Sequence, residues 1–573
     1  MTTMIREQTR PAWLAEPTDR LLASVTAAHS RVIVALVLVC LAAFLPGFFQ
    51  IPPTDRDESR FAQATKQMVE TGDFIDIRFQ DEVRYKKPVG IYWLQAGFVM
   101  GGEALGVPKA LTRIWLYRLP SLIGATGAVL LTYWTALAFT PRRYAFLAAL
   151  MLAGSVLLSV EARLAKTDAM LLLTVTAVMG SLARAYLGRR HGSDGSSGLV
   201  LPAIFWTGLA AGVLLKGPVI LLVVFLTAAT LIAVDRSAGW VARLRPAIGI
   251  PLFVVLVLPW FWAIFSRAGE SFLAESVGRD LLPKLFSAQE GHGAPPGFYL
   301  VLFWVTFWPA APLAALAAPG AWDERRERPT LFLLAWLVPS WVAFELVVTK
   351  LPHYVLPLYP AIAVLIARSL WHGTLATSLW LKRGTLGWPI FAALVTITGV
   401  VILMVMRRQL GLLAWPFGAA AMVVGFMAWR YYDADGAEKS MLRAVAASIL
   451  VFLAVLGIIV PSLRPLFPSA TLARVLASDA CDDKVIAAAG YQEPSLVFLL
   501  GTSVRLTDGA GAADVLREGY CRFAVIEARE QRGFVQRAEK IGLLYASFAR
   551  VDGVNINNGR ALSLAVYRSV RVP

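Results

Sequence analysis

Thirteen long apolar stretches dominate this chain and constrain its fold more than any other feature. Each is close to the roughly 20 residues that an α-helix needs to cross the hydrocarbon core of a bilayer. They cover residues 31–49, 119–139, 144–160, 168–186, 199–216, 218–234, 247–265, 298–318, 330–349, 352–371, 387–406, 413–430 and 443–462. Because backbone polar groups in lipid must be hydrogen-bonded within their own segment, such stretches predict helices. The sequence therefore predicts a polytopic α-helical membrane protein with about 13 transmembrane helices.

The composition agrees with this class and excludes others. Hydrophobic residues make up 57% of the chain and charged residues only 16%, whereas about a quarter of an ordinary soluble domain is charged. The net charge of +16 does not indicate nucleic-acid binding, because the Arg and Lys residues lie between apolar stretches, where they act as topology signals. Cys40, Cys481 and Cys521 have no metal-site spacing. We predict no resident metal and no certain cofactor, and leave a divalent cation open.

Basic residues predict the orientation of the chain. With residues 1–30 in the cytoplasm, alternation places these clusters on the same side: Arg142/Arg143, Arg189/Arg190, Arg236/Arg243/Arg245, Arg325/Arg326/Arg328 and Lys382/Arg383. Arg407/Arg408 are the one exception. The agreement requires the apolar segment 89–106 to lie along the outer interface as an amphipathic helix instead of crossing. Loop 50–118 and everything after residue 463 then lie on the outer side, whereas residues 31–462 form the membrane domain.

Residues 463–573 have the composition of a soluble α/β domain. Short apolar segments predict strands at Val485–Ala489, Leu496–Leu500 and Arg522–Ile526, and amphipathic stretches predict helices at Ala512–Glu518 and Gln531–Ile541. On the outer side of a membrane disulfides persist, so Cys481 and Cys521 either pair or remain two buried thiols.

The unusual polar residues gather in the predicted outer segments. They occur in Thr54–Phe61, Arg84–Pro88, Glu161–Asp168, Lys216–Pro218, 267–297 and Lys350–Tyr354. Two ammonium groups at Lys86 and Lys87 lie where an anionic headgroup would sit. Each segment also has a simpler interpretation: clustered charges that pair with one another, Asp168 as a helix cap, or Lys216 as a snorkelling residue at a tight turn, which we favour for Lys216. Segment 267–297 is long enough to form a lid, or it is a disordered connector.

Together these segments resemble the GT-C type membrane glycosyltransferases, specifically the lipid A aminoarabinose transferase-like family, related to protein O-mannosyltransferases (glycosyltransferase families 83 and 39). The matching signatures are Asp57-Glu58-Ser59-Arg60-Phe61-Ala62, Tyr85-Lys86-Lys87-Pro88 with Tyr92-Trp93, Arg118-Leu119-Pro120-Ser121, the turn from Arg163 to Asp168, Lys216-Gly217-Pro218 and Lys350-Leu351-Pro352-His353-Tyr354. The chain departs from relatives at Lys86, where they often carry an acidic residue.

The resemblance implies a multi-pass protein of the bacterial inner membrane with a periplasmic active site and a periplasmic C-terminal domain. It implies transfer of a sugar from a polyprenyl-phosphate-linked donor to a lipid A-like glycolipid, or alternatively to a protein. The catalytic residues it implies are Asp57 and Asp168, with Glu58 beside them. The substrate-binding residues that it implies are Arg60, Tyr85, Lys87, Arg163, Arg279, Lys350, His353 and Tyr354. Of these, Arg60, Lys87 and Arg279 are expected to hold the donor phosphate.

The expected chemistry fits these residue types. Breaking the bond between a sugar and a lipid phosphate leaves negative charge on the phosphate, which preorganised cations stabilise. An acceptor hydroxyl also needs a general base, for which Asp57 is the first candidate and Asp168 the second. A transporter would instead place charges near the bilayer midplane and often show repeated halves, and no internal repeat is visible here. A non-catalytic scaffold would not need the paired carboxylates.

Overall fold

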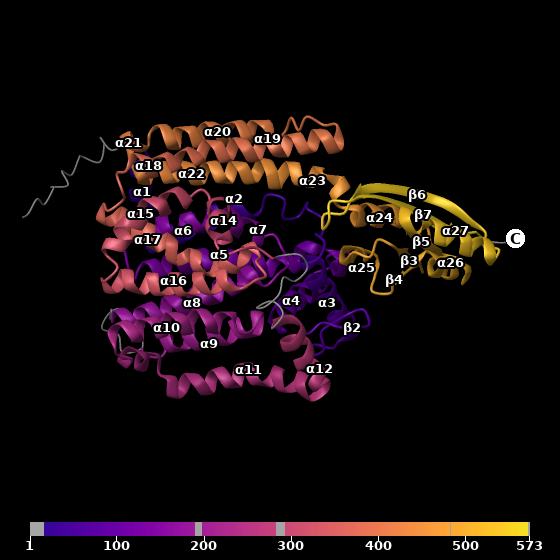
Figure 1. The fold of residues 1–573 in the computed structure, drawn as a ribbon, viewed down its shortest axis with the longest axis horizontal. Coiled ribbons are helices and arrows are strands. Elements are labelled where there is room, and N and C mark those ends of the chain that lie inside the picture. The colour runs from indigo at the N-terminus through magenta and orange to yellow at the C-terminus, as the bar shows by residue number, and fades with distance from the viewer. Residues whose placement is uncertain (1–16, 189–197, 282–292, 482, 571–573) are drawn as a thin grey trace, which may run out of the picture.

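A computed structural model describes residues 17–188, 198–281, 293–481 and 483–570, and it shows a helical bundle with a smaller sheet domain at one end (Figure 1). Helix occupies part of every one of the thirteen predicted apolar stretches. The bundle helices are α2 (His29–Phe44), α5 (Ile114–Ala136), α6 (Arg142–Ala153), α7 (Val156–Glu161), α8 (Asp168–Leu187), α9 (Val200–Lys216), α10 (Val219–Asp235), α11 (Pro246–Ala268), α14 (Phe298–Thr306), α15 (Ala311–Asp323), α16 (Arg328–Leu346), α17 (Tyr359–His372), α19 (Gly387–Arg407), α20 (Trp415–Arg430), α22 (Ala437–Phe452) and α23 (Val460–Ser462).

Several predicted spans are shorter or broken in the structure. Among the described helices, seven are long and apolar enough to cross a membrane, or eight if α1 (Pro17–Thr26) and α2, which meet at a bend of 116°, form one span. Helices α9 and α10 have only 17 residues each. The stretch 144–160 is divided between α6 and α7, and the stretch 298–318 between α14 and α15. The helical membrane fold is confirmed, and the number of crossings stays a prediction.

Contacts between distant segments gather the predicted cytoplasmic loops at one end of the bundle. Arg142 Nη1 donates to the carbonyl oxygen of Ala27 over 2.5 Å, next to α1. Arg143 pairs with Glu438 at the start of α22, and Lys382 pairs with Asp433 in α21 (Tyr432–Asp435) over 2.7 Å. Figure 1 shows α1 and α21 at the end opposite to the sheet domain. The N-terminal helix and the C-terminal domain therefore lie at opposite ends of the bundle.

Loop 50–118 folds at the end of the bundle that faces the sheet domain. It contains α3 (Asp57–Thr71), the two-stranded hairpin of β1 (Arg78–Phe79) and β2 (Glu82–Val83), and α4 (Gly90–Ala104). Helix α4 covers the segment predicted to lie along the interface, and its 15 residues are fewer than a span requires. Gly90 allows a close approach, since a Cβ there would lie 2.7 Å from the carbonyl oxygen of Leu214 in α9.

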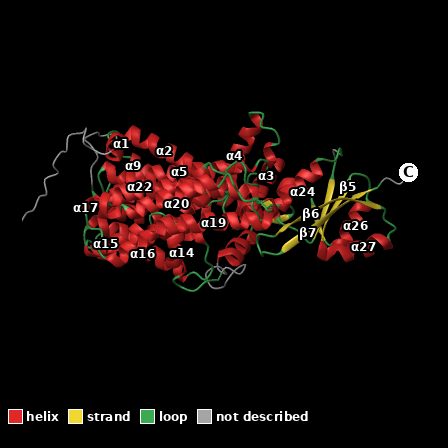
Figure 2. Cartoon of the chain, turned by 90° about the horizontal axis from the view of Figure 1, so that it is seen from above, coloured by secondary structure: helices red, strands yellow, loops and turns green. Residues whose placement is uncertain are grey.

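The C-terminal domain contains a five-stranded sheet in the order β4-β3-β5-β7-β6. Figure 2 shows strands of this sheet beyond the end of the helical bundle. Strands β4 (Arg505–Thr507), β3 (Val485–Ala489) and β5 (Arg522–Glu527) are parallel, whereas β7 (Ala561–Ser569) runs antiparallel to both β5 and β6 (Tyr545–Val554). Its helices are α24 (Pro468–Ala477), α25 (Pro494–Leu500), α26 (Gly509–Arg517) and α27 (Gln531–Lys540).

Most predicted elements of this domain are confirmed, and one is wrong. The structure has the predicted strands at β3 and β5 and the predicted helices at α26 and α27. Leu496–Leu500 is not a strand but part of α25, because Pro494 occupies the first turn of a helix, where its missing N–H is tolerated. Cys481 and Cys521 form a disulfide with a Cα–Cα distance of 5.9 Å. The disulfide joins the segment just before β3 to the residue just before β5, and these two strands are neighbours in the sheet. The interpretation as two free thiols is therefore excluded.

Candidate active site

The first catalytic candidate, Asp57, lies at the start of α3 in a short loop held on both sides. Arg56, just before it, has φ 64° and ψ −114°, a conformation that costs a residue other than glycine about 1–3 kcal/mol. Such strain persists only where neighbouring contacts fix the backbone. The side chain of Asp57 is half-buried and interacts electrostatically with Lys166, a member of the buried network described below.

Glu58 supplies one of the contacts that fix this loop. Its carboxylate is buried and accepts hydrogen bonds from Arg118 of α5, with Nε to Oε1 at 2.7 Å and Nη2 to Oε2 at 3.0 Å. The backbone N–H groups of Thr54 and Ala165 donate to it over 2.8 and 3.0 Å. Burial raises the pKa of Glu58, but the Arg118 guanidinium and these donors outweigh burial and hold the pKa below its usual value. Both oxygens are thus occupied, which favours a structural role for Glu58 over the predicted catalytic one.

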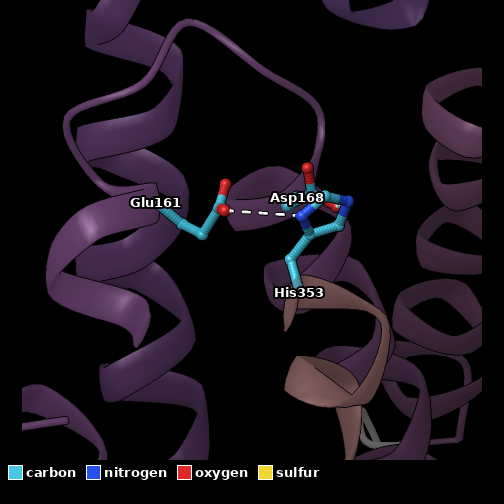
Figure 3. A group of neighbouring side chains, drawn as sticks. All are labelled: Glu161, Asp168 and His353. Carbon is cyan, nitrogen blue, oxygen red and sulfur yellow. Dashed lines mark ion pairs between the residues drawn. The ribbon is translucent and has the colours of Figure 1, made fainter. Parts of the chain in front are cut away.

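The second catalytic candidate, Asp168, begins α8 and lies in a buried network of charges. Lys216, the last residue of α9, donates to Asp168 Oδ1. Lys166 Nζ lies 3.0 Å from Glu161 Oε1 and 3.8 Å from Asp168 Oδ2. His353 lies between the two carboxylates, with Nδ1 3.6 Å from Glu161 Oε1 and Nε2 3.7 Å from Asp168 Oδ1 (Figure 3). Three segments that are far apart in the sequence, Glu161–Asp168, the end of α9 and the turn at His353, therefore meet at one point.

The carboxylates of this network favour the charged form of Lys166. Burial disfavours the ammonium form of Lys166, but the carboxylates of Glu161 and Asp168 outweigh burial and raise its pKa. Asp57 also interacts electrostatically with Lys166, and Lys87 with His353. The first outer loop, which carries Asp57 and Lys87, therefore faces the Asp168 network.

Three side chains of this network could hold a metal ion. The ligand atoms of Glu161, Asp168 and His353 lie within 4.8 Å of one another, and their N and O atoms suit a divalent cation. Lys166 and Lys216, however, already neutralise both carboxylates. A bound cation would have to displace at least one ammonium group, so the charge balance favours the lysines over a metal at this point.

The structure brings together some of the predicted substrate-binding residues and separates others. His353 belongs to the network, and Lys87 interacts electrostatically with it. Tyr354 lies beside the network, since Lys216 Nζ is 5.3 Å from the centre of its ring. Arg60 lies one turn into α3, and its N–H donates to the carbonyl oxygen of Arg56 over 3.0 Å. The backbone of Arg279 lies in the helical turn Ala274–Leu281, and its side chain is outside the described part of the structure.

Three other predicted substrate-binding residues make contacts within the protein. Arg163 donates to the carbonyl oxygens of Pro46, Ala43 and Ser159 and so braces the end of α2 against α7. The hydroxyl of Tyr85 donates to Asp76 Oδ1 over 2.7 Å. Lys350 is buried, and its Nζ donates to the carbonyl oxygen of Val347 over 2.7 Å. These contacts favour support of the site over contact with the substrate.

Sequence reasoning missed several members of the network. Lys216 does not snorkel to the surface as predicted, because Gly217, with φ 66°, ends α9 so that the lysine meets Asp168. Glu161 and Lys166 were seen only as parts of a charged turn, and Arg118 only as part of a signature. These four residues lie at or near the ends of apolar helices, where an unpaired charge raises the free energy of the folded protein. That position is the sequence signal that predicts a charged partner for each of them.

The predicted lid is described only in part. Segment 267–297 begins with α12 (Glu270–Leu273) and the turn Ala274–Leu281, and Phe272 packs edge-on against Tyr85 with ring centres 5.6 Å apart. Residues 282–292 lie outside the described residues. The role of this segment as a lid stays a prediction.

The fold and this network define a polytopic membrane protein with a charged site at one end of an apolar bundle, and known proteins are similar to it in sequence and in fold. Residues 53–270 match the family model of dolichyl-phosphate-mannose-protein mannosyltransferases. The undecaprenyl phosphate-α-4-amino-4-deoxy-L-arabinose arabinosyl transferase of Aeromonas hydrophila is 30% identical over 343 residues, which cover 58% of this chain and 59% of that protein. A transferase of the same name from Pseudomonas fluorescens is 29% identical over 370 residues, covering 61% and 58%. The chain thus spans less than two thirds of the relatives it matches.

Solved structures extend the likeness to nearly the whole chain. Apo ArnT from Cupriavidus metallidurans aligns with a TM-score of 0.73 at 19% identity, covering 93% of this chain and 97% of that one. The same protein bound to undecaprenyl phosphate aligns with a TM-score of 0.72, also at 19% identity, covering 94% and 98%. The chain therefore has the ArnT fold, and its sequence is similar to those of aminoarabinose transferases.

Proposed function

We propose that this chain transfers a sugar from an undecaprenyl-phosphate-linked donor to an acceptor of the bacterial envelope, with a lipid A-like glycolipid as the acceptor. The observation that carries the proposal is the convergence of Asp57 and Lys87 on the Asp168–Lys216 network at one end of an apolar bundle. A lipid-linked donor can keep its tail in the bilayer while its phosphate reaches cations at the surface. The names of the similar transferases support this donor class.

The two carboxylates take different roles in this proposal. Asp168 is surrounded by Lys216, Lys166 and His353, so it holds these cationic and donor groups in place. Asp57, half-buried at the start of α3, is the general base for an acceptor hydroxyl. Lys87, which interacts electrostatically with His353, stabilises the negative charge that develops on the donor phosphate. Arg60 and Arg279 are proposed to assist Lys87 at the phosphate.

The reaction then follows as one displacement. The acceptor oxygen forms a bond to the anomeric carbon while the bond from that carbon to the phosphate oxygen breaks. The acceptor proton passes to Asp57, and the electron pair of the broken bond stays on undecaprenyl phosphate. If the acceptor is itself a phosphate, it is already anionic and needs no base. The proposed step uses no metal.

The site is proposed to face the periplasm. The Cys481–Cys521 disulfide supports this placement, because disulfides persist in the periplasm and are rare in the cytosol. The basic loops at the opposite end of the bundle support it as well, since Lys and Arg mark the cytoplasmic side. A transporter is less well supported, because its charges belong near the bilayer midplane.

Mass spectrometry of envelope glycolipids and glycoproteins from cells with and without the gene tests this proposal. We expect a glycolipid species that carries one additional sugar to disappear on deletion and to return with the wild-type gene but not with Asp57→Asn. Loss of a glycosylated protein with unchanged glycolipids would mean that the acceptor is a protein. The match to the mannosyltransferase family model supports protein glycosylation as this alternative. Unchanged glycolipids and glycoproteins would overturn the proposal.

A further inference from the structure

The C-terminal domain rests directly on the helix that begins with Asp57. Gln63, Lys66 and Glu70 lie three and four residues apart and so share one face of α3. Gln63 Nε2 donates to Thr502 Oγ1 over 2.8 Å, Lys66 Nζ to the carbonyl oxygen of Phe498 over 3.1 Å, and Thr502 Oγ1 to Glu70 Oε2 over 2.6 Å. This face of α3 is therefore hydrogen-bonded to α25 and to the turn that follows it.

The contact continues into the loop just before Asp57. Asp55 Oδ1 accepts a hydrogen bond from the backbone N–H of Ser495 over 3.2 Å, and Asp55 Oδ2 accepts one from the hydroxyl of Tyr491 over 3.4 Å. Ser495 and Tyr491 are themselves joined through Ser469, at 2.6 and 2.9 Å. Asp55 is therefore bound to a buried group of hydroxyls in the C-terminal domain.

Asp55 and Glu58 fix the loop from opposite sides. Asp55 is bound to the C-terminal domain, and Glu58 is bound to Arg118 of the bundle over 2.7 Å. Between them lie Arg56, with its unfavourable φ of 64°, and Asp57. A residue in this conformation relaxes if one of its anchors is released. The direction of the Asp57 carboxylate therefore depends on both anchors.

We propose that the C-terminal domain positions Asp57 for catalysis, with Asp55 as the positioning residue through its hydrogen bonds with Ser495 and Tyr491. This inference rests on the proposed function for the role of Asp57, but the anchoring itself can be measured without any sugar transfer. The C-terminal domain then acts as a part of the active-site support and not only as a separate periplasmic module. Asp55 itself does not contact the substrate.

Three variants of the full-length protein in detergent test the proposal. Asp55→Ala removes both acceptors, Asp55→Asn keeps one acceptor oxygen for Ser495 and restores a polar contact with Tyr491, and Thr502→Ala removes contacts in the same interface farther from Asp57. Hydrogen exchange is measured by mass spectrometry in the peptide covering residues 52–61. Transfer is measured with undecaprenyl-phosphate-linked 4-amino-4-deoxy-L-arabinose and lipid A as probes.

We expect Asp55→Ala to speed exchange in residues 52–61 at least about tenfold and to lower kcat by about 10- to 100-fold, with the KM for the donor within about twofold of wild type. Asp55→Asn should restore slow exchange and most of kcat, and Thr502→Ala should leave both near wild type. If Asp55→Ala does not fold, Tyr491→Phe should also speed exchange and lower kcat, by smaller factors. Exchange at the wild-type rate in Asp55→Ala would overturn the proposal.

The two proposals fail in different ways in this experiment. If the wild type transfers no sugar to lipid A while Asp55→Ala still speeds exchange, the positioning contact stands and the proposed function fails. If exchange is slow in every variant while the wild type transfers sugar, the positioning role fails and the proposed function stands. A fall of kcat in Asp55→Ala that Asp55→Asn does not restore would also overturn the positioning role, because it would require the charge of Asp55 itself.

Discussion

Lys216, the last residue of α9, donates to Asp168, the first residue of α8, over a sequence separation of 48 residues, and this ion pair is the centre of the buried network. Breaking a buried ion pair by removing one partner costs up to about 3–5 kcal/mol, and Lys166, 3.8 Å from Asp168 Oδ2, compensates only part of the charge that Lys216 leaves behind. Lys216→Met should therefore lower thermal stability strongly and abolish transfer.

The double variant Asp168→Asn/Lys216→Met provides the control for this prediction. Removal of both charges leaves no unpaired partner, so stability should return most of the way to wild type, whereas transfer should stay lost. Thermal unfolding of the four proteins of this cycle in detergent measures the coupling between the two residues. Additive losses in the double variant would show that the pair does not act as a unit.

Lys87→Ala should weaken binding of undecaprenyl phosphate by about tenfold to a hundredfold. A charge-assisted hydrogen bond to phosphate contributes about 1.5–3 kcal/mol, and every 1.4 kcal/mol corresponds to a factor of ten. Lys86→Ala is the matched control, because it removes the same charge from the next residue, whose side chain is exposed. Isothermal titration of both variants checks the prediction, and equal losses would mean that only the general positive charge of the loop matters.

Asp55→Asn should stabilise the protein near neutral pH. Burial, with a smaller contribution from Glu493, raises the pKa of Asp55 from 3.8 to about 6 although Ser495 and Tyr491 donate to it. A raised pKa means that the folded state favours protonated Asp55, so its contribution is fully present below about pH 3.8 and is lost as the pH rises through 6. Asn is always neutral, so the variant should gain at most about 3 kcal/mol at pH 7.5.

The pH dependence separates this prediction from a general stabilisation. The difference in melting temperature between Asp55→Asn and wild type should shrink as the pH falls from 7.5 to 5, and it should be close to zero near pH 4. A difference that is constant over this range would contradict the raised pKa of Asp55.

Sequence reasoning predicted the helices of the bundle well, because the requirement for about 20 apolar residues per crossing is local in sequence. It predicted less of the site, because the partners of its charges are distant. Glu58 lies 60 residues from Arg118, and Lys216 lies 48 residues from Asp168, so nothing local distinguishes a buried pair from a solvated charge. The error at Leu496–Leu500 has a different cause: a short apolar run fits a strand or a buried helix equally well.

The predicted sidedness can be tested with single cysteines in a background without Cys40, Cys481 and Cys521. Ser59 is buried in the structure, so the labelling position in loop 50–118 is the exposed Glu82 of β2. Cysteines at Glu82 and Gly501 should react with an impermeant maleimide in intact cells, whereas those at Asp323 and Asp435 should react only after permeabilisation. Because Gln63 of α3 contacts Thr502, next to Gly501, both outer positions must lie in one compartment. Labelling at Glu82 but not at Gly501 would contradict the thirteen-span topology.

The central claim, that Asp57 is the base of a lipid-linked sugar transfer, is tested most directly by a reconstituted reaction. Purified wild type and Asp57→Asn are each incubated with undecaprenyl-phosphate-linked 4-amino-4-deoxy-L-arabinose and lipid A, and the products are measured by mass spectrometry. We predict that the wild type adds the sugar and that Asp57→Asn loses at least about 100-fold in kcat, with unchanged expression and melting temperature, since the substitution preserves size and removes only charge. Full activity of Asp57→Asn would contradict the account.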